Sequence, residues 1–430
     1  MVAQAAHVSE APLLRYTRWA LAVTVAGMWA YAFRFKVGPL PTTVLEILVF
    51  ITVALYLIHR YRVRDWTLPA RTGLEIPNGL FVLAAIIGIF VSPLHLGALG
   101  LFRAYFIEPL LIFYIALDLL RTTQHFRVVL LGFAVGATLF AILNLGAWAI
   151  ELLRHSVIAT GNAPEFLYTS PNDVAMFYEP PLAIAAGFAL YANDSRDRQV
   201  AIACLVFLLP ATVLTLSRAG LLTLAVLAVV VVVTMPQRRL KLALLGGAIV
   251  SGLVISQLPY VSSRLFRQFD PSYRFNTFEG RLQIWRDTLH MLRDHPIFGA
   301  GLRGYMDVMT PYITPPRTPE LFPHDLWLAL WSEVGLLGLV AFVALLAMLL
   351  WRGWRAFVGA TGFYRALLWG TSAAFVTIVV HGMFDTPYLK NDYAVEFWIV
   401  AALQIAAIRM MRAPISSDQK PEAPALWKKE

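Results

Sequence analysis

The chain has little charge and almost no cysteine for its 430 residues. Charged residues make up 14% of the sequence, against roughly 25% in soluble domains, and 59% of the residues are hydrophobic. The single cysteine, Cys204, lies in an apolar run and excludes an intrachain disulfide or a cysteine-based metal cluster. This composition excludes an ordinary soluble domain and predicts a polytopic membrane protein.

The signatures of several familiar enzyme classes are also missing. The sequence has no P-loop and no HExxH zinc motif, and no GxGxxG follows a predicted strand. The first predicted outer loop, 34–38, has no carboxylate, although several membrane glycosyltransferases carry a metal-binding carboxylate pair there. Acids of the long polar stretch 259–323 are dispersed, whereas a metal site needs clustered oxygen ligands. We therefore predict no bound metal and no cofactor.

Apolar runs of about 20 residues, the length that crosses a membrane, recur along the chain. They predict an all-α polytopic membrane protein of about twelve transmembrane helices, with one long extracytoplasmic loop that contains short helices. Helices 1–9 fall in residues 1–258, the long loop in 259–325, helices 10–12 in 326–411 and a cytoplasmic tail in 412–430. The predicted spans are 17–33, 39–58, 77–92, 99–119, 127–150, 173–192, 199–216, 219–235, 240–258, 326–351, 364–384 and 393–411.

Basic residues are unevenly divided between the two sides of these spans. An even number of spans puts both termini on one side, and that side collects most of the lysines and arginines. By the positive-inside rule both termini are cytoplasmic and the long loop is extracytoplasmic. The net charge of +9 therefore mostly reflects topology, and we predict no nucleic-acid partner. The short outer loops hold only Arg34, Lys36, Arg103, Arg154, Arg218 and Lys390.

The polar stretch 259–323 contains eight arginines and no lysine. The planar guanidinium fork of arginine matches phosphate oxygens in a bidentate manner that an ammonium cannot achieve. This bias suggests a phosphate ligand. Arg281 lies near the start of a predicted amphipathic helix, 279–292, and helix N-termini favour anions. The predicted apolar stripe of that helix is Leu282, Trp285, Leu289 and Leu292, with Pro296 ending it.

A second arginine, Arg218, lies in a very short hairpin between two apolar runs. Its guanidinium is expected at the outer membrane boundary, where Ala219 and Gly220 leave room for a bulky ligand; the alternative is a snorkelling interfacial arginine. The glycine-rich run 298–304 would let a ligand approach the backbone, but we favour a plain turn.

Two histidines are candidates for proton transfer. His324, beside Asp325, is expected in the first turn of a span, where it could act as a base near neutral pH; a helix-capping polar pair is the alternative. His381 lies near Asp385 at the outer end of another span, and we interpret that pair as supporting structure or as acceptor binding.

These residues together resemble one known family, the O-antigen ligase and polymerase superfamily. The likeness extends over roughly 165–390, and it depends on the order, spacing and outer placement of short motifs. They are 170–175 with Pro180-Pro181, 217–220, 280–285, 296–301, His324-Asp325, and Glu333-Val334-Gly335 with Gly338.

The resemblance implies a GT-C-like fold and a lipopolysaccharide O-antigen ligase in the bacterial inner membrane, with its active site facing the periplasm. Its donor would be O-antigen linked to undecaprenyl pyrophosphate and its acceptor the lipid A-core oligosaccharide, both reached from among the membrane lipids. Arg218 and Arg281 would bind the donor pyrophosphate, and His324 would be the essential histidine. Asp325 departs from the family pattern, because many relatives have Asn there. Supporting or acceptor-binding roles are assigned to Asp385, Asp325, Asn172 and Arg303.

The chemistry expected of such a site needs no metal. Pyrophosphate is a good leaving group, and two arginine forks can stabilise its developing charge. His324 would take the acceptor proton in a single displacement, which predicts inversion, since paired hydrolase carboxylates are not evident. Two alternatives in the same class are an O-antigen polymerase and a protein O-oligosaccharyltransferase. A secondary transporter or lipid flippase is the alternative of another class, but the chain lacks the paired repeats typical of transporters.

Overall fold

The computed structural model describes residues 12–38, 40–67, 71–154, 166–168, 170–235, 237, 241, 277–315 and 320–412. Helices dominate these residues, and the strands among them form one short hairpin. The elements are α1 (Pro12–Ala26), η1 (Met28–Ala32), β1 (Arg34–Val37), β2 (Leu40–Thr43), α2 (Val44–Val63), α3 (Glu75–Val91), α4 (His95–Phe102), η2 (Arg103–Ile107), α5 (Glu108–Leu119), α6 (Thr123–Leu153), α8 (Pro171–Tyr191), α9 (Ser195–Leu214), α10 (Arg218–Thr234), α13 (Thr277–Asp294), α14 (Tyr305–Met309), η4 (Thr310–Tyr312), α15 (Leu326–Gly359), α16 (Gly362–His381) and α17 (Asn391–Arg412).

The predicted class, an all-α polytopic membrane protein, is confirmed. Among the described residues, eight helices are long and apolar enough to cross a membrane, with α3 and α10 as shorter apolar helices. These ten helices and α1 coincide with eleven of the predicted spans, with shifted boundaries. The predicted span 240–258 lies outside the described residues except for Lys241, so the count of twelve stays a prediction.

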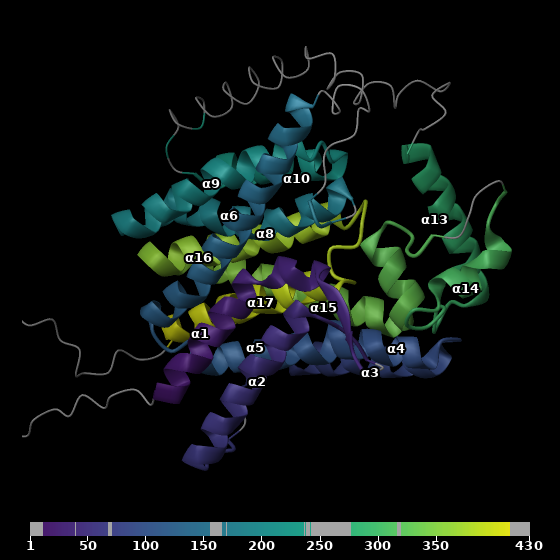
Figure 1. Cartoon of the computed structure of the whole chain (residues 1–430), viewed down its shortest axis with the longest axis horizontal. Helices are drawn as coiled ribbons and strands as arrows, with labels where there is room; N and C mark the ends of the chain where they lie inside the picture. The colour runs from purple at the N-terminus through teal and green to yellow at the C-terminus, as the bar shows by residue number, and fades with distance from the viewer. Residues whose placement is uncertain are drawn as a thin grey trace, which may run out of the picture.

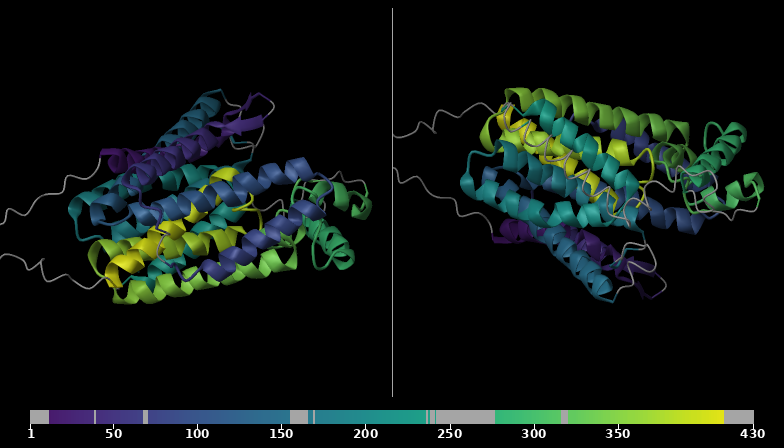
Figure 2. Two further views of the ribbon diagram at one scale, coloured as in Figure 1. Left: turned by 90° about the horizontal axis from the view of Figure 1, so that it is seen from below. Right: turned by 90° about the horizontal axis from the view of Figure 1, so that it is seen from above.

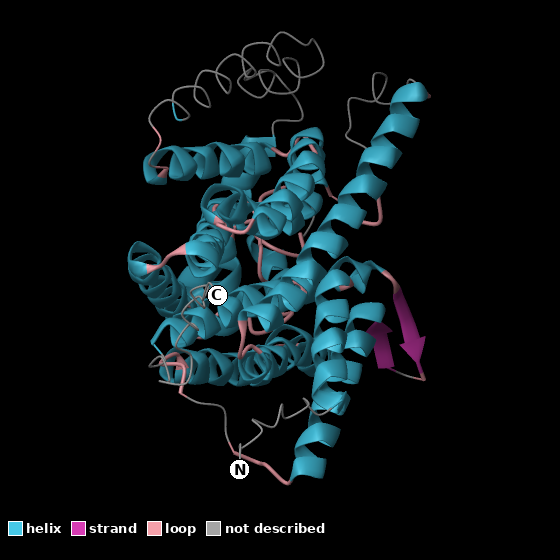
Figure 3. Ribbon diagram, turned by 90° about the vertical axis from the view of Figure 1, so that its left-hand side faces the viewer, coloured by secondary structure: helices cyan, strands magenta, loops and turns pink. Residues whose placement is uncertain are grey.

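The second predicted span, 39–58, was wrong at its start, because a β-hairpin precedes the helix (Figure 3, magenta). Strand β2 pairs antiparallel with β1, with Arg34 opposite Thr43. Helix α2 begins only after Thr43, whose hydroxyl accepts from the Glu46 amide at 3.1 Å while the Glu46 carboxylate accepts from the Thr43 amide at 3.2 Å. This reciprocal capping box fixes the helix start.

Helices α8, α16 and α17 form the buried centre of the bundle (Figures 1 and 2). All residues of α17 from Asn391 to Ile408 are buried. Helices α8 and α16 approach closely because glycines face the neighbouring backbone: a Cβ on Gly187 would lie 2.5 Å from the Ala366 oxygen, and one on Gly370 would lie 2.7 Å from the Ile184 Cα.

The two ends of the bundle differ in character. Helices α13 and α14 project from one end (Figure 2). Basic residues tie loops together at the other end, where Arg352 donates to the Thr72 oxygen at 2.7 Å and Arg409 donates to the Arg71 oxygen at 3.1 Å. The arginines assigned to the cytoplasmic side thus gather opposite α13, and the sidedness itself stays a prediction.

Helix α13 confirms the predicted amphipathic helix and ends before Pro296, but its buried face differs from the predicted stripe. Leu289 is 42% exposed, whereas Met291 and Thr288 are fully buried. The Thr288 hydroxyl bonds to the Ile284 oxygen and the Tyr305 hydroxyl, both at 2.7 Å. The stripe was wrong at Leu289, although Leu292 is buried, because Tyr305, which comes after the helix, packs against the face that carries Thr288.

The glycine-rich run 298–304 after α13 packs against α15. Helix α15 is interrupted at Gly335, whose φ of 68° lies in the left-handed region that favours glycine. A Cβ there would lie 2.5 Å from the Ile297 oxygen, and one on Gly299, with φ of 66°, would lie 2.3 Å from the Ser332 oxygen. The run is therefore a tight packing turn, as favoured from the sequence.

Candidate active site

Asp385 is the centre of a polar cluster at the end of the bundle that carries α13. It lies in the turn after α16, and its residue is 7% exposed. One carboxylate oxygen accepts from Asn172 Nδ2 at 2.8 Å and lies 3.5 Å from Arg281 Nη2. The other accepts from the Thr386 amide at 3.0 Å and lies 3.4 Å from His324 Nδ1. One carboxylate thus links α8, α13 and His324, which directly precedes Asp325, the N-cap of α15.

Arg218 and Arg281 line one cavity of about 310 Å³ beside this cluster. The first residues of two helices, α8 and α10, also line it, and free amides and the helix dipole make such N-termini favourable to anions. Phe278, Phe384 and Leu222 supply apolar wall. The cavity therefore combines two arginines, two helix N-termini and an apolar side, a combination that suits an anionic group attached to a hydrophobic chain.

Gly220 does not enlarge this cavity, which corrects one expectation. A Cβ on Gly220 would lie 2.8 Å from the Ala175 Cβ, so this glycine allows α10 to pack against α8. Ala219 does line the cavity. Ser217 caps α10 through the Gly220 amide at 3.0 Å and donates to Asn172 Oδ1 at 2.6 Å. The hairpin is thereby held against the residue that holds Asp385.

The sequence predicted His324 in the first turn of the helix, but the residue lies before the helix begins. Its φ of 51° is left-handed, and Asp325 is the N-cap, accepting from the Leu328 amide at 2.8 Å. The expected capping pair is thus divided: Asp325 caps, while His324 turns toward Asp385 with its side chain 33% exposed. A ring that donates from Nδ1 to a carboxylate presents Nε2 as its basic nitrogen.

Burial and the neighbouring charges shift the pKa values in this cluster. Burial alone would raise the pKa of Asp385, but the hydrogen bond and charge of His324, together with Arg281, hold it well below its usual range. Burial lowers the pKa of the Arg281 guanidinium, and Asp385 partly offsets this; an arginine nevertheless stays charged. Burial raises the pKa of Asp325 to about 6, although hydrogen bonds from the backbone amides of Leu328 and Trp327 act to lower it. Asp385 is therefore an anion at neutral pH.

Two residues named from the sequence lie apart from the Asp385 carboxylate. Arg303 is exposed in the glycine-rich turn, and its amide donates to the Glu333 carboxylate. His381 is fully buried and bonds to Glu179 at 2.7 Å rather than to the Asp385 side chain. Its backbone oxygen accepts from the Asp385 amide at 3.0 Å, which agrees with a supporting position.

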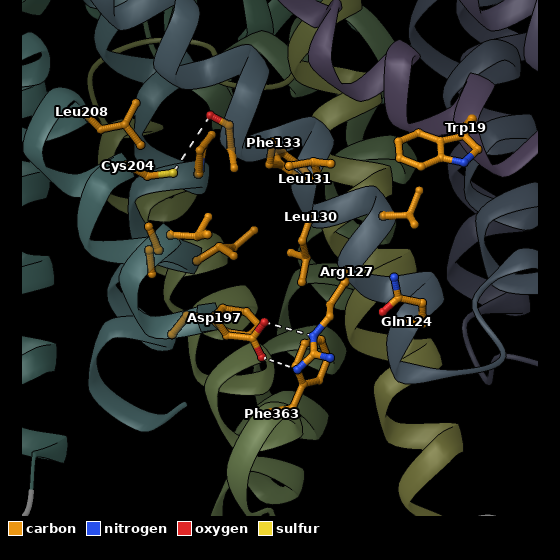
Figure 4. A pocket seen from close by; sticks show the side chains of 18 residues that line it. Trp19, Gln124, Arg127, Leu130, Leu131, Phe133, Asp197, Cys204, Leu208 and Phe363 are labelled. Atoms are coloured by element: carbon orange, nitrogen blue, oxygen red, sulfur yellow. Dashed lines mark hydrogen bonds and ion pairs between the residues drawn. The ribbon is translucent and has the colours of Figure 1, made fainter. Parts of the chain in front are cut away.

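A second cavity, of about 300 Å³, lies among α1, α6, α8 and α9 at the opposite end of the bundle. Its walls are mostly apolar, with Leu130, Phe133 and Cys204 among them (Figure 4). Its charged groups, Arg127 and Asp197, bind each other at 3.0 and 2.8 Å. Because this pair is mutually neutralised and far from the Asp385 cluster along α16, we do not place the chemistry here.

Sequence reasoning missed the position of Asp385 between the arginine and the histidine. It also missed an ion pair next to the cluster, in which Lys390 binds Asp173 at 2.9 Å. The Lys390 ammonium lies 4.9 Å from the centre of the Tyr31 ring and 4.7 Å from that of Tyr168. The available signal was an Asn-Asp pair at the start of each of two helices, at 172–173 and at 391–392. Among the described residues no group of three or more metal-binding side chains occurs, and metal independence stays a prediction.

Fold and site together define a polytopic membrane protein with a cavity lined by two arginines beside a histidine–carboxylate pair. Residues 203–343, about a third of the chain, match the family model described as O-antigen ligase. This segment therefore resembles the O-antigen ligase family, and the match supports the family that the motifs indicated. The match contains Arg218, Arg281 and His324. No curated protein matched the chain.

Proposed function

We propose that the chain is an O-antigen ligase. It transfers glycan from undecaprenyl pyrophosphate to a sugar of the lipid A-core, at the periplasmic face of the bacterial inner membrane, by an inverting displacement that needs no metal. The observation that carries the proposal is that Arg281 and His324 share the Asp385 carboxylate, at 3.5 and 3.4 Å, beside a cavity that Arg218 and Arg281 line.

The donor pyrophosphate would occupy the cavity between the two arginines. Their guanidinium groups and the N-termini of α8 and α10 would stabilise the charge that builds on the leaving group. Phe278 and Leu222 would face the first isoprenoid units, because both line the same cavity. A lipid-linked donor could then enter from the membrane beside α10.

His324 would act as the base toward the acceptor. As the acceptor oxygen attacks the anomeric carbon, its proton passes to His324 Nε2 and the bond between that carbon and the pyrophosphate oxygen breaks. Undecaprenyl pyrophosphate then leaves as an anion. Asp385 would keep the ring in the tautomer that can accept this proton and would stabilise the charged ring.

The test is reconstitution with lipid-linked glycan and purified lipid A-core, with a chelator present. We expect glycan on the lipid A-core, inversion at the anomeric carbon by NMR, and loss of transfer in His324→Ala. His295→Ala is the matched control, because His295 is an exposed histidine of the same extramembrane segment. Product formed only after metal is restored, or retention of configuration, would contradict the mechanism.

The same assay separates the alternatives. Longer lipid-linked glycan without modified lipid A-core would identify a polymerase. Glycan on a protein hydroxyl would identify an oligosaccharyltransferase. Movement of the lipid-linked donor across the bilayer without any transfer would identify a transporter or flippase.

A further inference from the structure

The turn that follows α13 exposes two large apolar side chains. Ile297 is 61% exposed and Phe298 is 52% exposed, although the residues just before them, from Arg293 to Pro296, are mostly polar and also exposed. A rigid apolar pair at the surface of a polar segment indicates contact with an apolar partner.

This turn is fixed to α15 by hydrogen bonds. Trp331 Nε1 donates to the Pro296 oxygen at 2.7 Å, and the Leu336 amide donates to the Ile297 oxygen at 2.9 Å. The second bond forms at the Gly335 interruption of α15, where the helix leaves an amide for it. The height of Ile297 relative to the membrane is therefore set by the height of α15.

The sequence of α15 indicates where the membrane begins. Trp331 and Trp351 are 20 residues apart, which is about 30 Å at a rise of 1.5 Å per residue with the Gly335 interruption counted as helix, and this matches the thickness of the hydrocarbon core. Tryptophan is enriched at membrane interfaces, and Arg352 follows at one of them. Leu336 lies inside this interval, so the turn bonded to it lies at the edge of the hydrocarbon.

The exposed apolar face of α15 continues into the turn. Leu336, Val340 and Val343 are 43%, 58% and 45% exposed, and their spacing puts them on one face of a candidate membrane span. That face meets lipid, and the Ile297 backbone is bonded to its first residue. Because the exposed turn continues this lipid-facing surface of α15, we expect its apolar partner to be lipid hydrocarbon.

We propose that Ile297 and Phe298 insert into the outer leaflet and anchor the segment that carries α13 to the membrane surface. Because α13 ends at Asp294, three residues before Ile297, the anchor fixes the height of Arg281 above the bilayer. The proposal does not depend on the reaction that the site performs.

Cys204 is the single cysteine of the chain, so a Cys204→Ala background permits a site-specific probe. Phe298→Cys in that background is labelled with an environment-sensitive fluorophore and reconstituted into vesicles with lipids brominated at defined acyl positions. Arg286→Cys, on the exposed face of α13, is the matched control. We expect blue-shifted emission at position 298, quenched most by shallow bromines, and aqueous emission at position 286. Equal, aqueous emission at the two positions overturns the proposal, as does strongest quenching by bromines near the bilayer centre.

A second measurement tests the anchoring itself. Ile297→Ser combined with Phe298→Ser keeps the backbone hydrogen bonds of the turn, so the segment should fold but lose its hold on lipid. We expect the amides of α13 to exchange hydrogen faster in vesicles, and a spin label at position 286 to be more mobile. Unchanged mobility of α13 in this double variant would contradict an anchoring role.

Discussion

Replacing Asp385 by asparagine tests the proposed site most directly. The carboxylate lies within reach of four donors: Asn172, Thr386, Arg281 and His324. An amide of the same shape offers a single acceptor oxygen, and its own NH₂ group must face at least one of those donors. The replacement therefore disrupts either the hold on Arg281 or the tautomer of His324, without leaving a cavity.

The expected magnitude follows from the role of the carboxylate. A positioned base contributes about 10²–10⁴-fold to rate, and an orienting aspartate changed to asparagine removes most of such a contribution. The 3.4 Å separation between His324 and Asp385 is longer than a strong hydrogen bond, so the loss belongs in the lower part of that range. We expect kcat to fall about 10²–10³-fold, which is about 2.7–4 kcal/mol in activation free energy.

The assay is glycan transfer to lipid A-core in proteoliposomes at saturating donor, with thermal unfolding measured in parallel. Asp307→Asn is the control, because Asp307 is an exposed acid of the same extramembrane segment, and its activity should match the unchanged protein. A folded Asp385→Asn variant that keeps kcat within threefold would refute the reasoning that His324 is oriented by this carboxylate.

Three further predictions concern the neighbouring residues. Arg281→Lys keeps the charge but loses the planar fork, so transfer should fall at least about tenfold, while Arg286→Lys on the exposed face of α13 should not change it; equal effects would contradict a specific phosphate contact. Asp325→Asn keeps an N-cap acceptor and should stay active. Because the Asp325 pKa rises to about 6 in the folded chain, the original protein should lose thermal stability as pH rises from about 4 through 6, and this variant should lose less; identical profiles would show that Asp325 does not titrate there. Gly335→Ala should lower the melting temperature by several degrees, since its φ of 68° and the nearby Ile297 oxygen leave no place for a Cβ; an unchanged melting temperature would show that the interruption is not required.

The membrane class and most span positions follow from the sequence because they depend on apolar length alone. Arg218 and Arg281 could be grouped by the side of the membrane they share, and the structure does put both on one cavity. Apolar length could not locate the start of α2. The hairpin residues before it, which end at Thr43, mix polar and apolar side chains without a regular alternation. Local capping decided that boundary.

The central position of Asp385 was beyond the reach of sequence reasoning. Its partners come from residues 172, 281 and 324, and only tertiary packing determines which acid among several receives those donors. The prediction of the buried face of α13 failed for a related reason. That face is determined by contacts with Tyr305 and Met309, which come after the helix in the chain. Periodicity shows that a helix has two faces, and its neighbours decide their exact rotation.

The carboxylate shared by Arg281 and His324 also has a consequence for timing. An arginine drawn toward a bound pyrophosphate turns away from Asp385, and the oxygens that it leaves can then interact more strongly with the histidine. Donor binding and a closer contact between His324 and Asp385 would thus be coupled. We predict that the NMR chemical shifts of the His324 ring change when donor is added; unchanged shifts would contradict this coupling.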